Sequence, residues 1–318
     1  MEKHKVLIIK TGYSEVLDKH KKEKVVSYGD VLRVTPLLHL YKNDHVTWIT
    51  DEKAIPLLKG NNYINRLLVW NLENAMHLLR EDDFDTIINL EKNHDIGIFS
   101  NRLVKTWRRY GFRFDEQTNS AQAYDRAFDV LSMVSRHSLK KENNKTSQEL
   151  LFGLVGKKWN GEEYILGYKP KTNEKFDIGL NSIAGSKWPI KSWPKENWDN
   201  LEKRLNKDGF NITKQKDQGR DVLENLNSYI DWINSCKNII SIDSLGLHIA
   251  IALKKNVLGL FGPTPHKEFH FYNRGKAILP KHDQDCIPCF NKTCKKEECC
   301  MEDISVKRVY QEMIKLTQ

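Results

Sequence analysis

The sequence predicts an α/β protein made of two similar halves, each with a mainly parallel sheet. Short apolar segments bounded by turn residues alternate with amphipathic segments of helical period, which is the pattern of parallel strands joined by helices. A polar segment at residues 167–176 interrupts the alternation, which then begins again. A chain of 318 residues is long enough for two domains with separate cores. Two such domains predict a ligand cleft between them, at the carboxyl ends of their strands.

The first half, residues 1–166, is expected to form the N-terminal domain. Its strands are predicted at residues 6–10, 46–50, 67–70 and 86–90, and its helices at residues 31–41, 72–80 and 121–135. Residues 99–114 are rich in arginine and aromatic side chains. A packed helix whose arginines extend into solvent is favoured there, with an acceptor-facing surface as the alternative.

The second half, residues 177–318, is expected to form another domain after a linker at residues 167–176. Its strands are predicted at residues 178–181, 211–214, 239–242 and 257–261, and its helices at residues 198–206, 223–234, 247–253 and 303–317. Asp303 is placed to cap the last helix. Cys236 is expected to be a buried residue within a helix.

The composition restricts the partners and the cellular setting. A net charge of +9 favours acidic partners such as nucleotide diphosphates, nucleic acid or an anionic membrane face. An ordinary lysine-rich surface explains the charge equally well. No apolar run approaches the length of a spanning helix, and the first strand begins too early for a signal peptide. A cytoplasmic protein is therefore predicted, with contact to the inner membrane face left open.

The turn at residues 243–248 and the strand end at residues 261–264 are the most informative part of the sequence. A polar turn, Asp-Ser-Leu-Gly-Leu-His, follows a buried strand and opens a helix. Free amides at a helix N-terminus bind phosphate, and a glycine there is expected to let a ligand approach the backbone. This predicts a site for a nucleotide diphosphate, lined by Asp243, Ser244, Leu245, Gly246, His248, Gly262 and Thr264. For His248, a packed core position is an equal alternative.

A proline-containing loop at residues 184–198 carries Lys187 and Lys191. A lysine on a rigid loop can place a positive charge beside a leaving diphosphate. The alternative is a structural loop whose lysines are solvated.

Gly29 and Asp30 precede an apolar helical segment. Gly29 is expected to make the bend, and Asp30 lies at the helix start, where the helix dipole keeps a carboxylate ionised. An ionised carboxylate that faces a cleft can accept the proton of an attacking hydroxyl. A plain N-cap is the commoner use of aspartate at such a position.

Five of the six cysteines lie within residues 286–300. Their spacing, which begins with a C-x₂-C pair, is typical of a closed tetrahedral site for structural zinc or iron. The predicted ligands are Cys286, Cys289, Cys294 and Cys299, with Cys300 as the alternative to Cys299. Disulfides are disfavoured in a chain without an export signal.

Taken together, these motifs resemble glycosyltransferase family 9, the ADP-heptose heptosyltransferases. The resemblance spans nearly the whole chain in the family's order. It is carried by Gly29-Asp30, Lys-Ser-Trp-Pro at 191–194, the turn at 243–248, Phe-Gly-Pro-Thr at 261–264 and the cysteines up to Met301. The chain looks most similar to the branch with a cysteine cluster, which includes heptosyltransferases that act on autotransporter proteins.

The resemblance implies a GT-B fold, in which two Rossmann-like domains face each other across a cleft. The N-terminal domain would bind the acceptor and the C-terminal domain the nucleotide sugar. The implied reaction inverts the sugar, needs no catalytic metal, and moves a heptose from ADP-heptose to a hydroxyl of a lipopolysaccharide-type surface glycan or of a protein. Asp30 would be the general base, and Lys191 with the amides of residues 244–246 would stabilise the leaving diphosphate.

Three features depart from the family pattern. The turn reads Asp-Ser-Leu-Gly, with its glycine shifted by one residue. An inserted basic segment before Gly29 contains Glu15, a rival to Asp30 as the base. The family's Gly-Gly-x-x-Glu donor segment is replaced at residues 213–219, where Gln215 and Gln218 are candidates for donor contacts and a solvated loop is the alternative.

Two other functions are weighed against heptose transfer. The same scaffold could use a different nucleotide sugar. More distantly, the cysteines could form a knuckle in a nucleic-acid-binding protein, but no nucleic-acid-reading motif accompanies the basic residues. The acceptor and the oligomeric state stay open.

Overall fold

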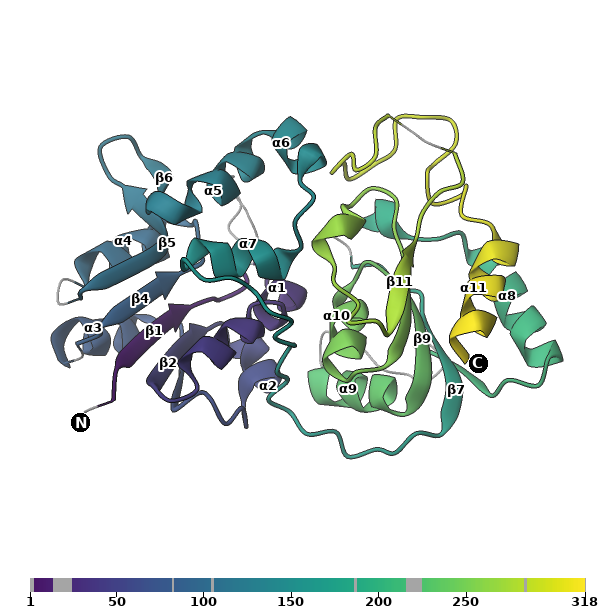
Figure 1. The fold of residues 1–318 in the computed structure, drawn as a ribbon, viewed down its shortest axis with the longest axis horizontal. Coiled ribbons are helices and arrows are strands. Elements are labelled where there is room, and N and C mark those ends of the chain that lie inside the picture. The colour runs from purple at the N-terminus through teal and green to yellow at the C-terminus, as the bar shows by residue number, and fades with distance from the viewer. Residues whose placement is uncertain are drawn as a thin grey trace. The chain divides into compact units, whose positions relative to one another are not determined.

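The computed structural model describes residues 3–13, 25–81, 83–103, 106–185, 188–215, 225–282 and 285–317. The chain divides into two compact units, Met1–Lys169 and Pro170–Gln318, and Figure 1 shows the elements of each. The boundary falls inside the segment predicted as a linker. The binding roles given to the two domains stay predictions.

The first unit contains a six-stranded sheet with the order β3-β2-β1-β4-β5-β6. Its first five strands pair in parallel, and β6 runs antiparallel to β5. The strands are β1 Lys5–Ile9, β2 His45–Thr50, β3 Arg66–Val69, β4 Thr86–Asn89, β5 Arg108–Asp115 and β6 Ser120–Ala123. The α-helices are α1 Tyr28–Leu32, α2 Ile55–Leu58, α3 Leu72–Glu81, α4 His94–Arg102, α5 Phe128–Ser135, α6 His137–Glu142 and α7 Ser147–Leu154.

The second unit contains a five-stranded, all-parallel sheet with the order β11-β10-β9-β7-β8. Its strands are β7 Phe176–Asn181, β8 Ile212–Lys214, β9 Cys236–Ile242, β10 Asn256–Leu260 and β11 Gly275–Ile278. Its α-helices are α8 Lys195–Lys207, α9 Leu226–Asn234, α10 Leu245–Ala252 and α11 Val306–Thr317.

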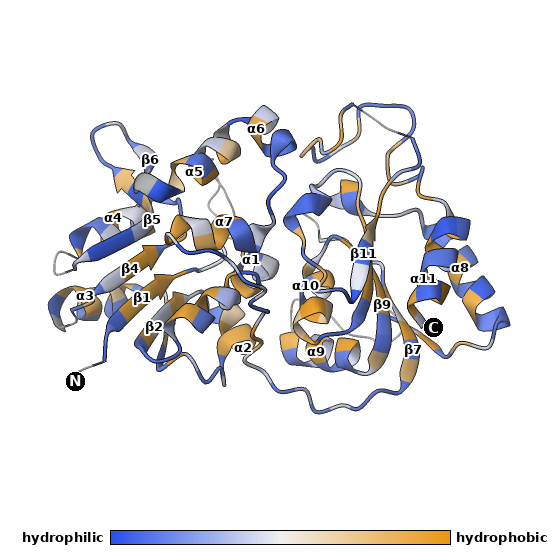
Figure 2. Cartoon of the chain, in the orientation of Figure 1, coloured by the Kyte–Doolittle hydropathy of each residue, from blue (hydrophilic) through white to orange (hydrophobic). Residues whose placement is uncertain are grey.

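Each sheet is apolar because helices cover it. Figure 2 shows central strands such as β1 and β4 largely in the hydrophobic colour, while helices such as α8 and α11 carry both colours. On one face of the second sheet, Leu180 and Ile240 pack with Leu201 of α8 and Met313 of α11. Burying such side chains contributes roughly 1.5–3 kcal/mol each. The predicted fold class, a two-sheet α/β protein, is confirmed.

The structure corrects the prediction of a helix at residues 99–114. Helix α4 ends at Arg102 and strand β5, which lies between β4 and the edge strand β6, starts at Arg108. A turn around Asp115, whose carboxylate accepts the amides of Gln117 and Thr118, joins β5 to β6. Residues 121–123 therefore belong to a hairpin, and the helix predicted at 121–135 starts at Phe128. Arginine and aromatic side chains that suggested a helix surface instead alternate along a strand.

Three smaller predictions also differ. The helix predicted at residues 31–41 divides into α1 and a 3-10 helix, Thr35–Tyr41, because Pro36 cannot donate a helical hydrogen bond. Cys236 is fully buried, as expected, but it begins strand β9. Asp303 accepts hydrogen bonds from His282, while the Ser305 hydroxyl accepts the Arg308 amide at the start of α11. Strand β11 was not predicted.

Among the described residues, no helix combines the length and the apolar character that crossing a bilayer requires.

Candidate functional site

The predicted residues of the second unit gather at the carboxyl edge of its sheet. Strands β9 and β10 are parallel neighbours, with Ile242 opposite Leu260. The turn after β9 and the loop after β10 therefore emerge side by side. The 3-10 helix Pro189–Lys191 brings a third segment to the same edge, as its contact with the β9 turn shows.

Lys191 and Asp243 form an ion pair at this edge. The distance from Lys191 Nζ to Asp243 Oδ2 is 2.7 Å, and the two side chains are 18% and 11% exposed. The ammonium also lies 5.9 Å from the Trp188 ring centroid. A lysine held in this way is a positive charge fixed at one point, whereas a solvated surface lysine samples many positions.

The surroundings of Asp243 favour its ionised form. Burial by itself would raise the pKa of this carboxyl group. The charge of Lys191 and its hydrogen bond outweigh burial, with help from Thr264 and His248, so the net pKa is lowered. The carboxylate thus stays charged near neutrality and holds the lysine in place.

Thr264 contributes an unsatisfied polar group to the site. Its hydroxyl oxygen is buried and, within the described part of the chain, makes no hydrogen bond of ordinary geometry, although it lies close enough to Asp243 to lower the pKa of that carboxyl group. Buried hydroxyls almost always have a partner. A ligand atom at this edge would supply one.

His248 is 8% exposed and packs against Phe269, with ring centroids 4.9 Å apart. It is also one of the groups that lower the pKa of Asp243. The packed position that the sequence left as an alternative is therefore what the structure describes, and a contact of His248 with a ligand stays a prediction.

Ser244 occupies the N-cap position of α10, but its side chain makes no capping hydrogen bond to the helix. Its hydroxyl accepts instead from Asn181 Nδ2 at 2.8 Å. The first amides of a helix have no partner within the helix, so the amides of Leu245 and Gly246 need one from outside it. This is the arrangement of an anion-binding turn.

The structure adds a reason for a glycine at position 246. A Cβ there would lie 2.3 Å from the Tyr229 hydroxyl and 2.4 Å from Asn181 Nδ2. The packing of α10 against two buried side chains is thus a reason for Gly246 that the sequence did not show, and the approach of a ligand to this backbone stays a prediction. Gly262 has a similar explanation, because its Cβ would meet Cys300 Sγ at 2.5 Å.

The cysteine segment is tied to the end of β10. The amide of Phe290 donates to Pro263 O, and Cys300 packs on Gly262. Hydrogen bonds with Cys300 and Cys294 help to lower the pKa of Cys299 to about 6, against the effect of burial. At least three of the predicted thiols are therefore neighbours. In the described ranges, however, no three His, Cys, Asp or Glu side chains are arranged as a metal-binding group.

The remaining predicted site residues are either buried in the structure or fall outside the residues that it describes. Gln215 is 4% exposed and its Oε1 accepts the amide of Ile183, so it is a buried structural residue rather than part of a solvated loop. Lys187, Gln218 and Glu15 lie outside the described residues.

In the first unit, Asp30 lies in the first turn of α1, as predicted. Its carboxylate is 28% exposed and pairs with Arg33 at 3.1 Å. Gly29, which was expected to make the bend, is a residue within helix α1, and Gly12 before it has a positive φ of 80°. The Gly12 carbonyl accepts the amide of Ser27, the N-cap residue of α1.

Glu91 is a buried carboxylate that the sequence analysis missed. It is 2% exposed, accepts the amides of Thr11 and Gly12 at 2.8 and 2.9 Å, and pairs with Lys10 Nζ at 3.1 Å. Through Gly12 it orders the loop that meets the start of α1. A glutamate directly after an apolar strand was the signal available in the sequence.

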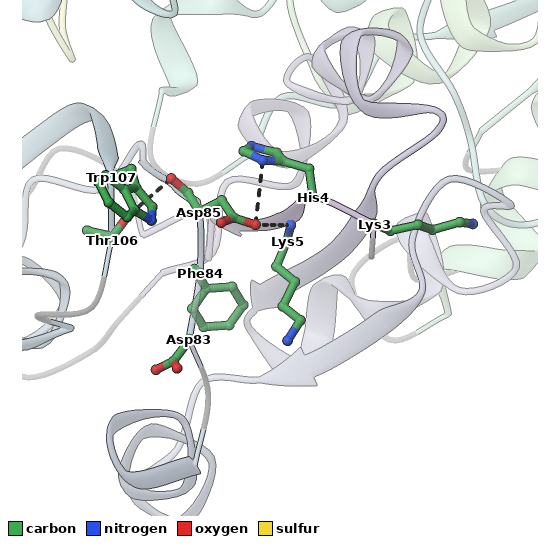
Figure 3. Close-up of a pocket in the computed structure, with 8 residues that line it drawn as sticks. All are labelled: Lys3, His4, Lys5, Asp83, Phe84, Asp85, Thr106 and Trp107. Carbon is green, nitrogen blue, oxygen red and sulfur yellow. Dashed lines mark hydrogen bonds and ion pairs between the residues drawn. The ribbon is translucent and has the colours of Figure 1, made fainter. Parts of the chain in front are cut away.

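A hollow of about 640 Å³ lies at the opposite, amino-terminal edge of the first sheet. Figure 3 shows its lining, which includes His4, Asp85 and the exposed Trp107. Asp85 is engaged by the Lys5 amide and by His4. None of the predicted site residues lines this hollow.

Solved structures similar to this chain define its class. Escherichia coli ADP-heptose lps heptosyltransferase II has a TM-score of 0.64 at 17% identity and covers 98% of both chains. Escherichia coli heptosyltransferase WaaC with ADP has a TM-score of 0.62 at 14% identity, covering 98% of this chain and 99% of that one. The iron-containing dodecameric glycosyltransferase TibC of Escherichia coli H10407 has a TM-score of 0.57 at 11% identity, covering 99% and 76%. The fold is that of the GT-B glycosyltransferases.

Sequence comparisons narrow this class to a family. Residues 222–300 match the model of glycosyltransferase family 9 (heptosyltransferase). Lipooligosaccharide heptosyltransferase 2 of Campylobacter jejuni is 34% identical over 83 residues, which cover 26% of each chain. Lipopolysaccharide heptosyltransferase 2 of Escherichia coli K12 is 24% identical over 250 residues, covering 67% of this chain and 68% of that one. The alignment thus spans about a quarter of the Campylobacter relative. The match to glycosyltransferase family 9 over residues 222–300 agrees with the resemblance seen in the motifs of this chain.

Proposed function

We propose that this protein is an inverting glycosyltransferase that moves a heptose from ADP-heptose to a hydroxyl group of a lipopolysaccharide-type glycan. The observation that carries the proposal is the family match over residues 222–300, because this segment contains Asp243, the α10 turn and Thr264. The names of the relatives, which are lipopolysaccharide and lipooligosaccharide heptosyltransferases, support the sugar and the acceptor class. Structures of the same fold solved with ADP and with an ADP-heptose analogue support the donor.

In the proposed reaction, negative charge develops on the diphosphate as its bond to the anomeric carbon breaks. Lys191, oriented by Asp243 at 2.7 Å, and the amides at the start of α10 would stabilise that charge. A fixed ammonium and fixed amides can do this without a catalytic metal. The leaving oxygen keeps the electron pair of the broken bond.

Asp30 is proposed as the general base. It would accept the proton of the acceptor hydroxyl as the hydroxyl oxygen bonds to the anomeric carbon from the face opposite the diphosphate. Its partial exposure supports this role, because an exposed carboxylate oxygen is within reach of a substrate. Contact of the basic chain with the inner membrane face remains part of the proposal.

The cysteine segment is proposed to hold a structural iron or zinc ion. The thiols of Cys294, Cys299 and Cys300 are already neighbours, and thiolates are the ligands that both ions prefer. The proposed ligands are Cys286, Cys289, Cys294 and Cys299, with Cys300 as the alternative to Cys299, because a closed structural site takes four ligands. TibC, whose structure is similar, is an iron-containing glycosyltransferase, which is a further reason to expect iron. No step of the transfer involves this ion.

Nucleotide binding tests the donor. Thermal unfolding should shift to higher temperature with ADP and much less with UDP or GDP at the same concentration, because a ligand stabilises the state that binds it. Mass spectrometry of reactions with ADP-heptose and candidate acceptors then identifies the product. A shift with UDP or GDP alone would favour the same scaffold with another nucleotide sugar.

A further inference from the structure

Asn181 is the last residue of β7 and is fully buried. Successive side chains of a strand point to opposite faces. Leu180 packs with α8 and α11, and Asn181 therefore points to the other face, where Tyr229 of α9 lies. In the sheet, Asn181 is paired with Ser241 of β9. Its amide thus lies behind the turn that starts α10.

All the polar atoms of the Asn181 amide group are engaged. Nδ2 donates to Ser241 Oγ at 2.7 Å and to Ser244 Oγ at 2.8 Å. Oδ1 accepts from the Tyr229 hydroxyl at 2.5 Å. Burial raises the pKa of Tyr229, so its hydroxyl keeps the proton that it donates. These three hydrogen bonds, to Ser241, Ser244 and Tyr229, fix the side-chain amide in one orientation.

The consequence concerns Ser244. A serine at an N-cap normally turns its oxygen to the second or third amide of its own helix, which here would be Gly246 or Leu247. Asn181 holds that oxygen away from the helix, since Ser244 makes no capping bond. The Leu247 amide donates to the Ser244 carbonyl oxygen at 3.1 Å, so the amides of Leu245 and Gly246 are the ones kept for another acceptor.

We propose that Asn181 is a positioning residue of the donor site, which keeps the α10 amides open for phosphate by binding the side chain that would otherwise cap them. This inference rests on the proposed function for the identity of the ligand. Its structural part, the capture of Ser244, does not.

The test compares Asn181→Ala, Ser244→Ala and the double variant. In Asn181→Ala the freed Ser244 hydroxyl would cap α10 and compete with the diphosphate, so Kd for ADP and KM for the donor should rise roughly tenfold, while kcat changes by less than about threefold. Removing the hydroxyl in that background removes the competitor. The double variant should therefore bind ADP about as well as Ser244→Ala. If the double variant loses ADP affinity by the product of the losses in the two single variants, the proposal is wrong.

Tyr229→Phe is the matched control. It removes the Tyr229 hydroxyl, which donates to Asn181 Oδ1 and also contacts the Ser244 side chain, but it leaves the bond from Asn181 to Ser244. Its melting temperature should fall while Kd for ADP stays within about twofold of the wild type. If this variant weakens ADP binding as strongly as Asn181→Ala, general loosening of the turn explains both and the positioning role is wrong.

A crystal structure of Asn181→Ala separates this inference from the proposed function. Ser244 Oγ should lie within hydrogen-bond distance of the Gly246 or Leu247 amide. A side chain that stays in its original position contradicts the inference even if ADP binds. Failure of the wild-type protein to bind ADP contradicts the proposed donor, while the new capping bond would still establish what Asn181 does.

Discussion

Lys191 and Asp243 show what individual residues contribute. They lie 52 positions apart in the chain and meet at 2.7 Å. Both were predicted from the sequence as site residues, for separate reasons: Lys191 for the leaving diphosphate and Asp243 as a contact to the donor. Their pairing gives Asp243 a more definite role, because an ammonium held by a largely buried carboxylate cannot move away when no ligand is present.

The same pair predicts how stability depends on pH. The pKa of Asp243 is lower in the folded protein than in the unfolded chain. The contribution of this carboxylate to folding stability is therefore complete above its pKa in the unfolded chain, about 3.9. It is lost as the pH falls through the lower pKa of the folded protein. Urea unfolding of the wild type and Asp243→Asn should differ most near pH 6 and progressively less below about pH 4. A difference that grows on acidification would contradict this sign.

Replacing Asp30 by asparagine should remove the proposed base while keeping a side chain of nearly the same size and shape. We expect kcat to fall by roughly 10²–10⁴-fold, with ADP binding unchanged. Asp95→Asn, an exposed aspartate at the start of α4, is the control and should keep full activity. Substantial activity in Asp30→Asn would reassign the base, with Glu15 as the next residue to test.

Elements determine how closely these residues approach. Helix α10 lies against β7 and α9 so tightly that its second residue must be a glycine. The sequence shows the glycine, but the neighbours that exclude a Cβ, Asn181 and Tyr229, come from positions 65 and 17 residues earlier. The phosphate-binding turn and the approach of a ligand at its glycine stay predictions, while the packing reason for the glycine came only from the tertiary structure.

Gly246→Ala measures this packing. A Cβ within 2.4 Å of Asn181 Nδ2 forces α10 or the asparagine to move, which typically costs about 1–3 kcal/mol of unfolding free energy. Gly153→Ala in α7 is the matched control, because nothing lies within 4 Å of its Cβ. That change should stabilise the protein by up to about 1 kcal/mol. Equal effects of the two substitutions in chemical unfolding would refute the packing explanation.

At the scale of the whole molecule, each unit has its own sheet and its own apolar core. The cysteine segment joins β11 to α11 and packs on the end of β10. An ion bound there would connect the end of the second sheet to the last helix. The stability of the second unit should then depend on the metal, since binding free energy contributes directly to folding.

Metal analysis of the purified protein should find about one iron or zinc ion per chain. Cys286→Ser should lose most of it and melt at a lower temperature, while kcat measured below the melting range stays near the wild-type value. Cys236→Ser, at a buried cysteine of β9 outside the cluster, should retain the metal. Active protein without either metal would rule out the site.

By itself, the sequence determined the two-sheet α/β architecture, because strand and helix periods and buried strands are local properties. It also identified the family, since the turn at 243–248 and the Phe-Gly-Pro-Thr strand end are contiguous in the chain. The tertiary structure decided which groups meet: Lys191 with Asp243, Asn181 with Ser244, and Glu91 with the loop after β1. Those contacts depend on strand order and register, which bring distant positions within hydrogen-bond distance. The edge hairpin β5–β6 was missed for the same reason, because an exposed strand rich in arginine is specified by its pairing partner more than by its own composition.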